Sequence, residues 1–494
     1  MGNANVSVEL SLTGRRELTS TASEITRQNV VKVLAAVLAD HLNNAAESEY
    51  LYRYYKGEQP ILHRKKKVRP DINNKVLVNR ANEIVAFKSG YLVGEPIQYV
   101  SVNEKVTDDV NRLNSMMRAL SKHKLDKEIV DWQHIAGTAY RMVLPAKEYD
   151  GVPFGIWTLP PDDTFVVYRA DFKREPLMGV YVTCVNGTIP RYCIYTDKFY
   201  CEVESGAVVR GSYKPHSLGM VPIIEYPANS ARLGAFEIVL APLNAINMIE
   251  SNRVDGIEQF VQSLMKFINC DIDKEKFEQL AELGAIKVSS PEGKSADVQI
   301  ITSELNQSQT QVTVSDMYDT ILTICGMPNR NGGSSTSDTG SAVIMRDGWS
   351  AAEARAKDSE TMFSASERRM LQLVLRILRD STSADIGLSV DDMDIKFTRR
   401  NYDAIQSKSQ VLISMLAQPK IHPLLAFIHS GMFSDPESAY LMSKQYAEEM
   451  EKKMQEQQAK LAAPAPENDT TKPDEEGGEP KPDQADGDKQ PASA

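Results

Sequence analysis

The chain has 494 residues and a formal charge of −11, and residues 462–494 alone carry nine Asp or Glu against three Lys. The length exceeds what one hydrophobic core usually supports, and it indicates about three domains or one elongated subunit of several parts. The sequence contains no run of about 18 apolar residues, which excludes a membrane-spanning helix and a membrane as partner. Residues 1–24 lack the apolar core of a secretory signal, so we expect a flexible N-terminal arm.

The cysteines and the composition of the C-terminus predict the redox state of the thiols and a disordered segment. The five cysteines are odd in number and none has C-x-x-C spacing, so we interpret them as reduced thiols of a cytoplasmic protein. Residues 457–494 are rich in Pro, Asp, Glu and Gly and contain no aromatic residue. Such a segment cannot bury enough apolar surface to offset its ordering entropy, so we predict a disordered acidic tail.

Helical periodicity dominates the first third of the chain. Apolar stripes predict a helix over 25–55, ended by Gly57, and a second around 78–88, with Gly90 positioned as its stop. A further helix is predicted over 125–140.

The loop between the first two helices carries the most basic run of the chain. Its cations are Arg64, Lys65, Lys66, Lys67 and Arg69. A solvated loop is one interpretation, and attraction to nucleic-acid phosphates is the other, because phosphate binding needs only Lys and Arg. We therefore keep these five residues as candidate DNA contacts.

The periodicity changes to two between residues 155 and 226. Short alternating segments at 164–168, 179–183, 191–195 and 199–203 are separated by Gly, Asn, Asp and Pro. This pattern predicts an antiparallel meander. Because the meander lies inside an otherwise helical chain, the fold class is predicted to be α+β.

Two long helices around a small module follow the meander. The periodicity predicts a helix over residues 233–268, which would be about 50 Å long and would either protrude or be broken at Pro242. Its middle, 247–255, is more polar than a buried helix tolerates. A compact insertion over 269–302 precedes a helix that ends at Gly326. One apolar stripe of that helix consists of Val314, Met317, Tyr318, Ile321, Leu322 and Cys325. The layout is typical of a stalk that carries a head.

The remaining part begins with a polar Gly/Ser loop at 329–340. We predict a long helix over 341–380 after it. The last folded part, 386–456, opens with a strand at 393–401 and continues with helices around 411–416, 424–428 and 436–451.

No catalytic, cofactor-binding or metal-binding residues are predicted. The motifs H-E-x-x-H, G-x-S-x-G and G-x-x-x-x-G-K are absent, and two S-x-x-K matches, at 121–124 and 263–266, lack their companion motifs. The acidic groups Asp162–Asp163 and Asp391–Asp392 with Asp394 are explained more simply as solvated turns than as divalent-ion sites.

One stretch resembles a family signature. The sequence NKVLVNRANEIVAFKSGYLVGEPIQY at 74–99, together with Arg400–Asn401 and the Asp-Pro-Glu turn at 435–437, resembles the portal proteins of tailed bacteriophages. The similarity is to head-to-tail connector subunits of the type found in siphophages of Gram-positive hosts, and it covers about residues 50–451.

The resemblance implies a portal fold with a mainly helical body, a small antiparallel sheet, long stem helices and a C-terminal helical crown. The implied divisions are a wing at 25–232, a stem helix at 233–268, a clip at 269–303, a second stem helix at 304–328, a tunnel loop at 329–340, a long wing helix at 341–382 and a crown at 383–456. The channel-facing loop would consist of Asn331, Gly332, Gly333, Ser334, Ser335, Thr336, Ser337, Asp338, Thr339 and Gly340.

The resemblance also implies a structural function, with no enzymatic activity and no cofactor. The subunit would form a homo-oligomeric ring, usually a dodecamer, at one capsid vertex, and double-stranded DNA would pass through its channel. Implied partners are the terminase large subunit, a head-to-tail adaptor, and the major capsid and scaffolding proteins; the location is the virion, and the host cytoplasm during assembly. Two alternatives stay open: a head-completion or scaffold-like protein without a channel, and a DNA-processing enzyme.

Overall fold

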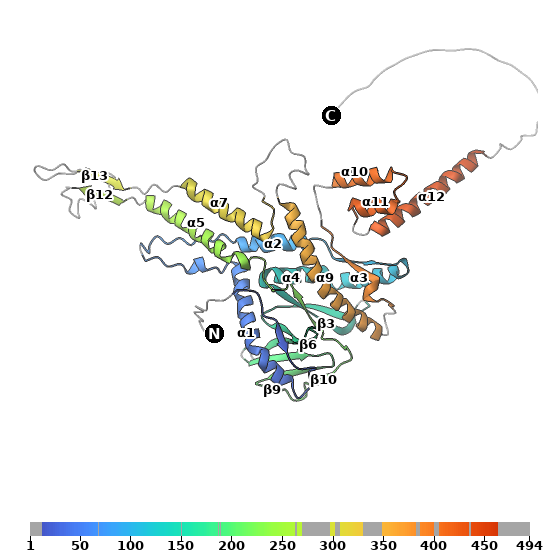
Figure 1. The fold of residues 1–494 in the computed structure, drawn as a ribbon, viewed down its shortest axis with the longest axis horizontal. Coiled ribbons are helices and arrows are strands. Elements are labelled where there is room, and N and C mark those ends of the chain that lie inside the picture. Colours follow the sequence, from blue (N-terminus) through green and yellow to red (C-terminus); the bar gives the residue numbers. More distant parts are fainter. Residues whose placement is uncertain are drawn as a thin grey trace, which may run out of the picture. The chain divides into compact units, whose positions relative to one another are not determined.

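The computed structural model describes residues 12–261, 264–268, 297–301, 307–329, 348–381, 386–399, 405–433 and 436–462, apart from 68, 150, 186 and 188. The chain divides into two compact units, residues 1–407 and residues 408–494. The first unit combines helices with small sheets, so the predicted α+β class is confirmed (Figure 1).

The helices of the first unit include four that precede strand β3 in the chain and three that follow strand β11. They are α1 (Val30–Lys56), α2 (Arg80–Val93), α3 (Thr107–Ala119), α4 (Lys122–Ala136), α5 (Leu240–Val261), α7 (Gln307–Cys325) and α9 (Trp349–Asp380). Gly57 ends α1 as predicted, because its φ of 104° is readily adopted only by glycine.

The predicted meander is the centre of a seven-stranded sheet. Its order is β1-β5-β6-β7-β8-β10, with β9 paired to β8. The strands are β1 (Leu18–Ser20), β5 (Thr164–Arg169), β6 (Pro176–Val185), β7 (Ile189–Tyr195), β8 (Phe199–Glu204), β9 (Ala207–Val208) and β10 (Lys214–Pro215). One face of this sheet packs on the N-terminal part of α1 through Val30, Val33, Leu34 and Val37.

A second, three-stranded antiparallel sheet lies under α9. Its order is β11 (Ile223–Pro227), β3 (Thr138–Tyr149) and β4 (Val152–Leu159). The face of α9 that meets it includes Phe363, Met370, Leu371, Val374 and Leu378, each 0 or 1% exposed. Two short antiparallel pairs complete the unit: β2 (Gln98–Ser101) with β14 (Met393–Lys396), and β12 (Leu264–Ile268) with β13 (Asp297–Ile301).

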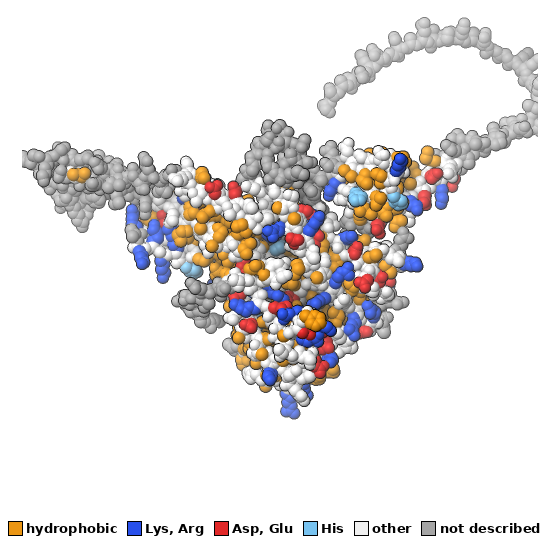
Figure 2. Space-filling model, viewed as in Figure 1, with side chains coloured by type: hydrophobic (Ala, Val, Ile, Leu, Met, Phe, Trp, Pro, Cys, Tyr) orange, Lys and Arg blue, Asp and Glu red, His pale blue; other side chains and the backbone are white. Residues whose placement is uncertain are grey.

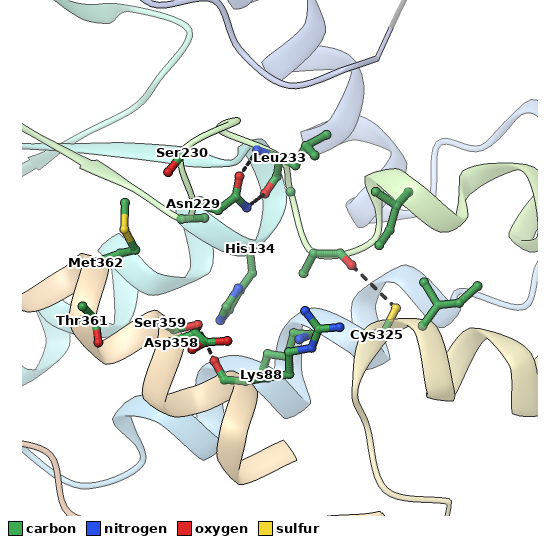
Figure 3. Close-up of a pocket in the computed structure, with 16 residues that line it drawn as sticks. Lys88, His134, Asn229, Ser230, Leu233, Cys325, Asp358, Ser359, Thr361 and Met362 are labelled. Carbon is green, nitrogen blue, oxygen red and sulfur yellow. Dashed lines mark hydrogen bonds between the residues drawn. The ribbon is translucent and has the colours of Figure 1, made fainter. Parts of the chain in front are cut away.

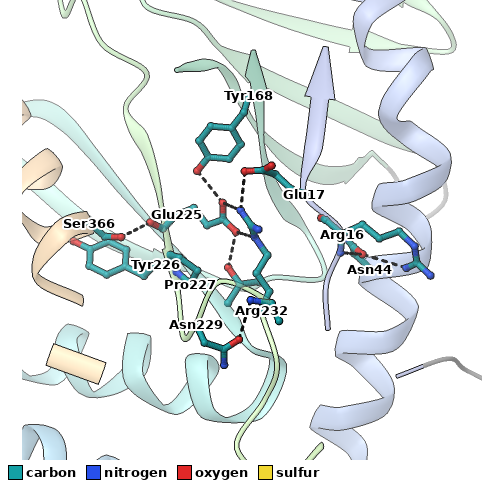
Figure 4. Close-up of polar contacts among 12 residues, drawn as sticks. Arg16, Glu17, Asn44, Tyr168, Glu225, Tyr226, Pro227, Asn229, Arg232 and Ser366 are labelled. Carbon is teal, nitrogen blue, oxygen red and sulfur yellow. Dashed lines mark hydrogen bonds and ion pairs between the residues drawn. The ribbon is translucent and has the colours of Figure 1, made fainter. Parts of the chain in front are cut away.

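The expected flexible arm is wrong for the residues of it that the structure describes. Strand β1 pairs in parallel with β5, and the Arg16 backbone N–H donates to Asn44 Oδ1 of α1 at 2.9 Å (Figure 4). Arg15 is 4% exposed, with Nη2 2.5 Å from a Glu237 carboxylate oxygen. This segment is ordered because buried ion pairs and a strand partner, both distant in sequence, hold it.

Several predicted helix boundaries also need correction. Helix α2 continues through Gly90 to Val93, because burial of Ser89, Leu92 and Val93 outweighs the roughly 1 kcal/mol that glycine costs inside a helix. Helix α4 stops at Gly137, whose φ is 80°, and the chain continues as β3.

The predicted helix over 233–268 is shorter than expected. It begins at Leu240, which places Pro242 in the first turn, where its missing N–H is harmless, and it ends at Val261. Residues 264–268 form strand β12, and a short apolar run of this kind does not distinguish strand from helix by periodicity. Helix α9 ends at Asp380 as predicted but begins at Trp349, after Gly348 with a φ of 81°.

The C-terminal helices are α10 (Ile405–Leu416), α11 (Pro423–Ser430) and α12 (Pro436–Ala462), close to their predicted positions. In the second unit α11 packs on α12, where the Phe427 and Tyr440 ring centroids are 5.9 Å apart. The strand β14 is only four residues long and belongs to the first unit, so residues 383–456 are not one body. Helix α12 extends past the predicted start of the disordered tail at 457, and residues 463–494 lie outside the described residues.

A buried ionic network joins the three-stranded sheet to its neighbouring helices. Glu367 of α9 is 0% exposed and accepts from Lys122 Nζ at 2.7 Å and Arg141 Nη1 at 3.0 Å. The hydroxyls of Tyr99 and Tyr226 donate to the same carboxylate, each at 2.6 Å.

Asp126 completes the network and balances its charge. It lies 2.7 Å from both Lys122 Nζ and Arg141 Nη2, so two cations face two anions. Burial acts to raise the pKa of Glu367, but the two cations and the Tyr226 hydroxyl outweigh it and hold the pKa well below its ordinary value.

Replacing Glu367 with Gln is expected to lower the free energy of unfolding by about 3–5 kcal/mol, because two buried cations would then face one carboxylate. Glu128→Gln is the matched control, since Glu128 pairs with Lys124 at the surface and such pairs contribute about 0–1 kcal/mol. Urea unfolding followed by circular dichroism measures both, and equal midpoints would contradict the expectation.

Candidate functional site

The polar middle of the predicted stalk helix forms a ladder with an extended segment. Three side chains spaced four residues apart on α5 accept hydrogen bonds from alternate backbone N–H groups of residues 74–78. The rungs are Val78 N to Asn247 Oδ1 at 2.9 Å, Val76 N to Ser251 Oγ at 3.0 Å and Asn74 N to Asp255 Oδ1 at 2.7 Å. Four helical residues rise about 6 Å and two extended residues about 6.6 Å, so the spacings match.

Asp255 is also where the basic loop is fixed to α5. Arg64 Nη1 and Lys66 Nζ each lie 3.0 Å from Asp255 Oδ2. Burial acts to raise the pKa of Asp255, but hydrogen bonds from Asn74 and from the Lys66 ammonium outweigh it and lower the pKa. Arg64 also bonds to Asn252. These two cations bind the protein itself, so they are neither solvated nor directed towards DNA.

The other cations of the run are placed differently. Lys65 and Lys67 are exposed, and Arg69 lies 3.6 Å from Asp71. Figure 2 shows Lys and Arg side chains gathered on the loop that runs beside α5. Of the five predicted DNA contacts, Arg64 and Lys66 therefore bind the protein and Arg69 pairs with Asp71. Lys65 and Lys67 are exposed to solvent.

Helices α5 and α7 pack side by side and connect to the strands β12 and β13 (Figure 1). Leu243 and Ile246 of α5 share a buried cluster with Ile321, Leu322 and Cys325 of α7, as the sequence stripe predicted for α7. Arg253 Nη1 donates to Gln311 Oε1 across the pair at 3.1 Å. The loop Asn331–Gly340 and residues 269–296 lie outside the described residues.

This helix pair exposes apolar side chains. The exposed apolar residues on it are Met248, Val254 and Ile257 of α5, and Val312 and Ile324 of α7. Figure 2 shows hydrophobic side chains gathered over the same two helices. Ile257 and Val312 are 54% and 58% exposed, an unfavourable state for β-branched apolar side chains in an isolated subunit.

A cleft of about 580 Å³ opens where α2, α4, α7 and α9 meet the 228–235 segment (Figure 3). Its polar lining includes Lys88, His134, Arg355 and Asp358. Cys325 is 3% exposed, and burial, only partly offset by Lys88 and Arg355, raises the pKa of its thiol to about 11. The thiol is therefore protonated near neutral pH and contacts the Ala235 carbonyl at 3.6 Å.

Among the described residues, no group of three or more metal-ligating side chains converges. Cys184, Cys193, Cys201 and Cys325 are free thiols in this part of the chain. No helix within the described ranges is long and apolar enough to cross a membrane.

The sequence matches the family described as "Phage portal protein, SPP1 Gp6-like" over residues 34–460. The chain therefore belongs to this family of phage portal proteins. It is 22% identical over 356 residues to the portal protein of Bacillus phage SPP1, covering 67% of each chain.

Two solved structures from gene transfer agent particles are also similar. They are described as the neck of an empty particle and as the virion of a native particle, with TM-scores of 0.45 and 0.44. Each is 12% identical and covers 78% of this chain and 94% of the other.

Asp255→Asn is expected to release the basic loop from α5, because Arg64 and Lys66 lose their shared carboxylate charge. Charge-assisted hydrogen bonds contribute about 1.5–3 kcal/mol, so local opening and trypsin cleavage at 64–67 should rise about tenfold or more. Glu250→Gln, which removes a carboxylate 2.9 Å from Arg253 on the same helix, is the control. Unchanged cleavage, measured by mass spectrometry, would show that the Asp255 carboxylate does not hold the loop.

Proposed function

We propose that this portal family member is a ring subunit, with about a dozen copies at one capsid vertex, whose axial channel passes double-stranded DNA during packaging and ejection. Membership of the portal family over residues 34–460 is the observation that carries the proposal. The exposed apolar residues of α5 and α7 support it, because a ring would bury them between neighbouring copies.

Within this ring, α5 and α7 act as the two stem helices, and residues 269–303 as the clip. The clip docks the terminase large subunit and, later, the head-to-tail adaptor. Residues 25–232 with α9 form the wing, residues 408–462 of the second unit form the crown, and residues 463–494 form an acidic tail. The major capsid and scaffolding proteins surround the ring in the virion, which assembles in the host cytoplasm.

We assign the loop Asn331–Gly340 to the channel. Its small polar residues permit ring-wide rearrangement at little steric cost. The negative charge of the chain favours passage of DNA, since fewer cations would be available to bind phosphates and slow its movement.

The alternative is a head-completion or scaffold-like protein without a channel. The two functions predict different masses, because only the portal closes a large ring of fixed symmetry. An enzymatic function would instead require metal- or nucleotide-dependent turnover.

Native mass determination of the full-length protein, with electron microscopy of the same peak, is expected to show a closed ring of about twelve copies with an axial hole. Ile257→Asp should shift the mass towards smaller species, because it places a charge on the α5 surface assigned to the interface. Val102→Asp is the control, since Val102 is at least as exposed as Ile257, at 59% against 54%, but directly follows β2 and belongs to neither α5 nor α7. Equal masses for both variants would remove α5 from the interface, and a wild-type monomer or dimer would favour the alternative.

Lys65 and Lys67 are our proposed contacts with packaged DNA. Replacing both with Gln is expected to lower the slope of log affinity for DNA against log salt by about 1.8, since each lost phosphate contact contributes about 0.9. Lys124→Gln with Lys127→Gln is matched in charge and lies on α4. A filter-binding salt titration measures both, and equal slopes for the two double variants would exclude the loop as a specific contact.

A further inference from the structure

The cleft beneath α9 contains positive charge without a matching partner. Lys88 of α2 and Arg355 of α9 line the same cleft, and neither forms an ion pair within the described part of the chain. Asp358, at the exposed rim, is not paired with either of them among the described residues. Two cations therefore face one hollow with no carboxylate bound to them.

His134 is a second, independent sign of a missing ligand. In Figure 3 the His134 side chain points into the cleft, near Lys88. The residue is only 8% exposed, yet its Nε2 atom has no hydrogen-bond partner in the structure. A buried polar nitrogen without a partner is unfavourable by about 1–3 kcal/mol, so the site favours an additional polar group.

The electrostatics of the cleft disfavour positive charge in its empty state. Burial lowers the pKa of Lys88, and the nearby Arg355 guanidinium lowers it further although the Cys325 thiol opposes this. Burial and Lys88 together lower the pKa of His134 to about 3. An anion bound between these groups would stabilise the charged lysine and accept a hydrogen bond from the His134 imidazole N–H.

The walls indicate what the anion is attached to. Beside the cations, the cleft is lined by Leu233, Ile238, Ile324 and Met362, and Ile238 is 56% exposed at the rim. The volume of about 580 Å³ far exceeds that of one carboxylate or phosphate group and lies within the range of ligand pockets. A group with a charged end and an apolar body fits both parts.

We propose that this cleft is a binding site for an oxyanion, a carboxylate or phosphate group carried on a short apolar body, held by Lys88 and Arg355 with His134 beside them. The oxyanion has two sources: a small molecule from solution, or an acidic side chain of a second copy of this chain. The site does not depend on the ring proposed above, although a ring would supply the second source.

Acetylation of Lys88, followed by peptide mass spectrometry on the full-length protein, tests the site. Only the neutral amine of Lys88 is acetylated, and burial lowers its pKa, whereas an opposite charge within hydrogen-bonding reach raises a pKa by about 1–3 units. Inorganic phosphate or butyrate, compared with chloride at equal ionic strength, should therefore slow acetylation at Lys88 about tenfold or more. Lys124, exposed on α4, is the internal control and should not change.

Arg355→Met gives the matched variant, because Arg355 is exposed and its loss should leave the fold intact, as circular dichroism can verify. The variant should lose most of the protection by phosphate and butyrate.

Protection by added anions in both assembled and unassembled protein identifies a small-molecule source. Protection of Lys88 on assembly alone, lost in Arg355→Met, identifies a side chain of a second copy. If neither added anions nor assembly slows Lys88 more than Lys124, or if Arg355→Met keeps full protection, the proposal is wrong.

Discussion

The carboxylate of Glu367 is the interaction on which the first unit depends. It receives four donors from four different elements, α4, β3, β11 and β2, and thereby connects α9 to the sheet and helices below it. Such a cluster is stable only when complete, because each partner left alone would be a buried, unpaired charge or hydroxyl. This all-or-none requirement fixes the position of α9, and α9 in turn forms one wall of the cleft and the surface to which the β2–β14 pair packs.

The sequence predicted elements well where the pattern is local. The α+β class, the four meander strands and the stripe of α7 required only periodicity and turn residues. The family resemblance rested on residues 74–99, on Arg400–Asn401 and on the turn at 435–437, and the match over residues 34–460 confirmed it. The boundaries failed where partners distant in sequence decide the structure: Gly90 stays helical because its neighbours are buried, and Leu18–Ser20 is a strand because β5 lies beside it.

The candidate sites were less predictable, for a related reason. The polarity of residues 247–255 was visible, and the spacing of Asn247, Ser251 and Asp255 was the signal that this face has a polar partner. That the partner is the backbone of residues 74–78 could not be read from composition. Likewise, the basic run did not reveal which of its cations turn inward to Asp255. The cleft was missed entirely, because Lys88, His134 and Arg355 come from three helices with no common motif.

The ladder between α5 and residues 74–78 also fixes the axial position of α5 relative to that segment. If α5 slid along its axis, no acceptor would meet a backbone N–H until the next repeat, about 6 Å away. A shift in the direction that brings Leu243 to the place of Asn247 also leaves one N–H without an acceptor. Intermediate positions break every rung at once. Axial load applied to α5 is therefore transferred to the extended segment, and through it to α2, without slippage: the two elements behave mechanically as a single strut.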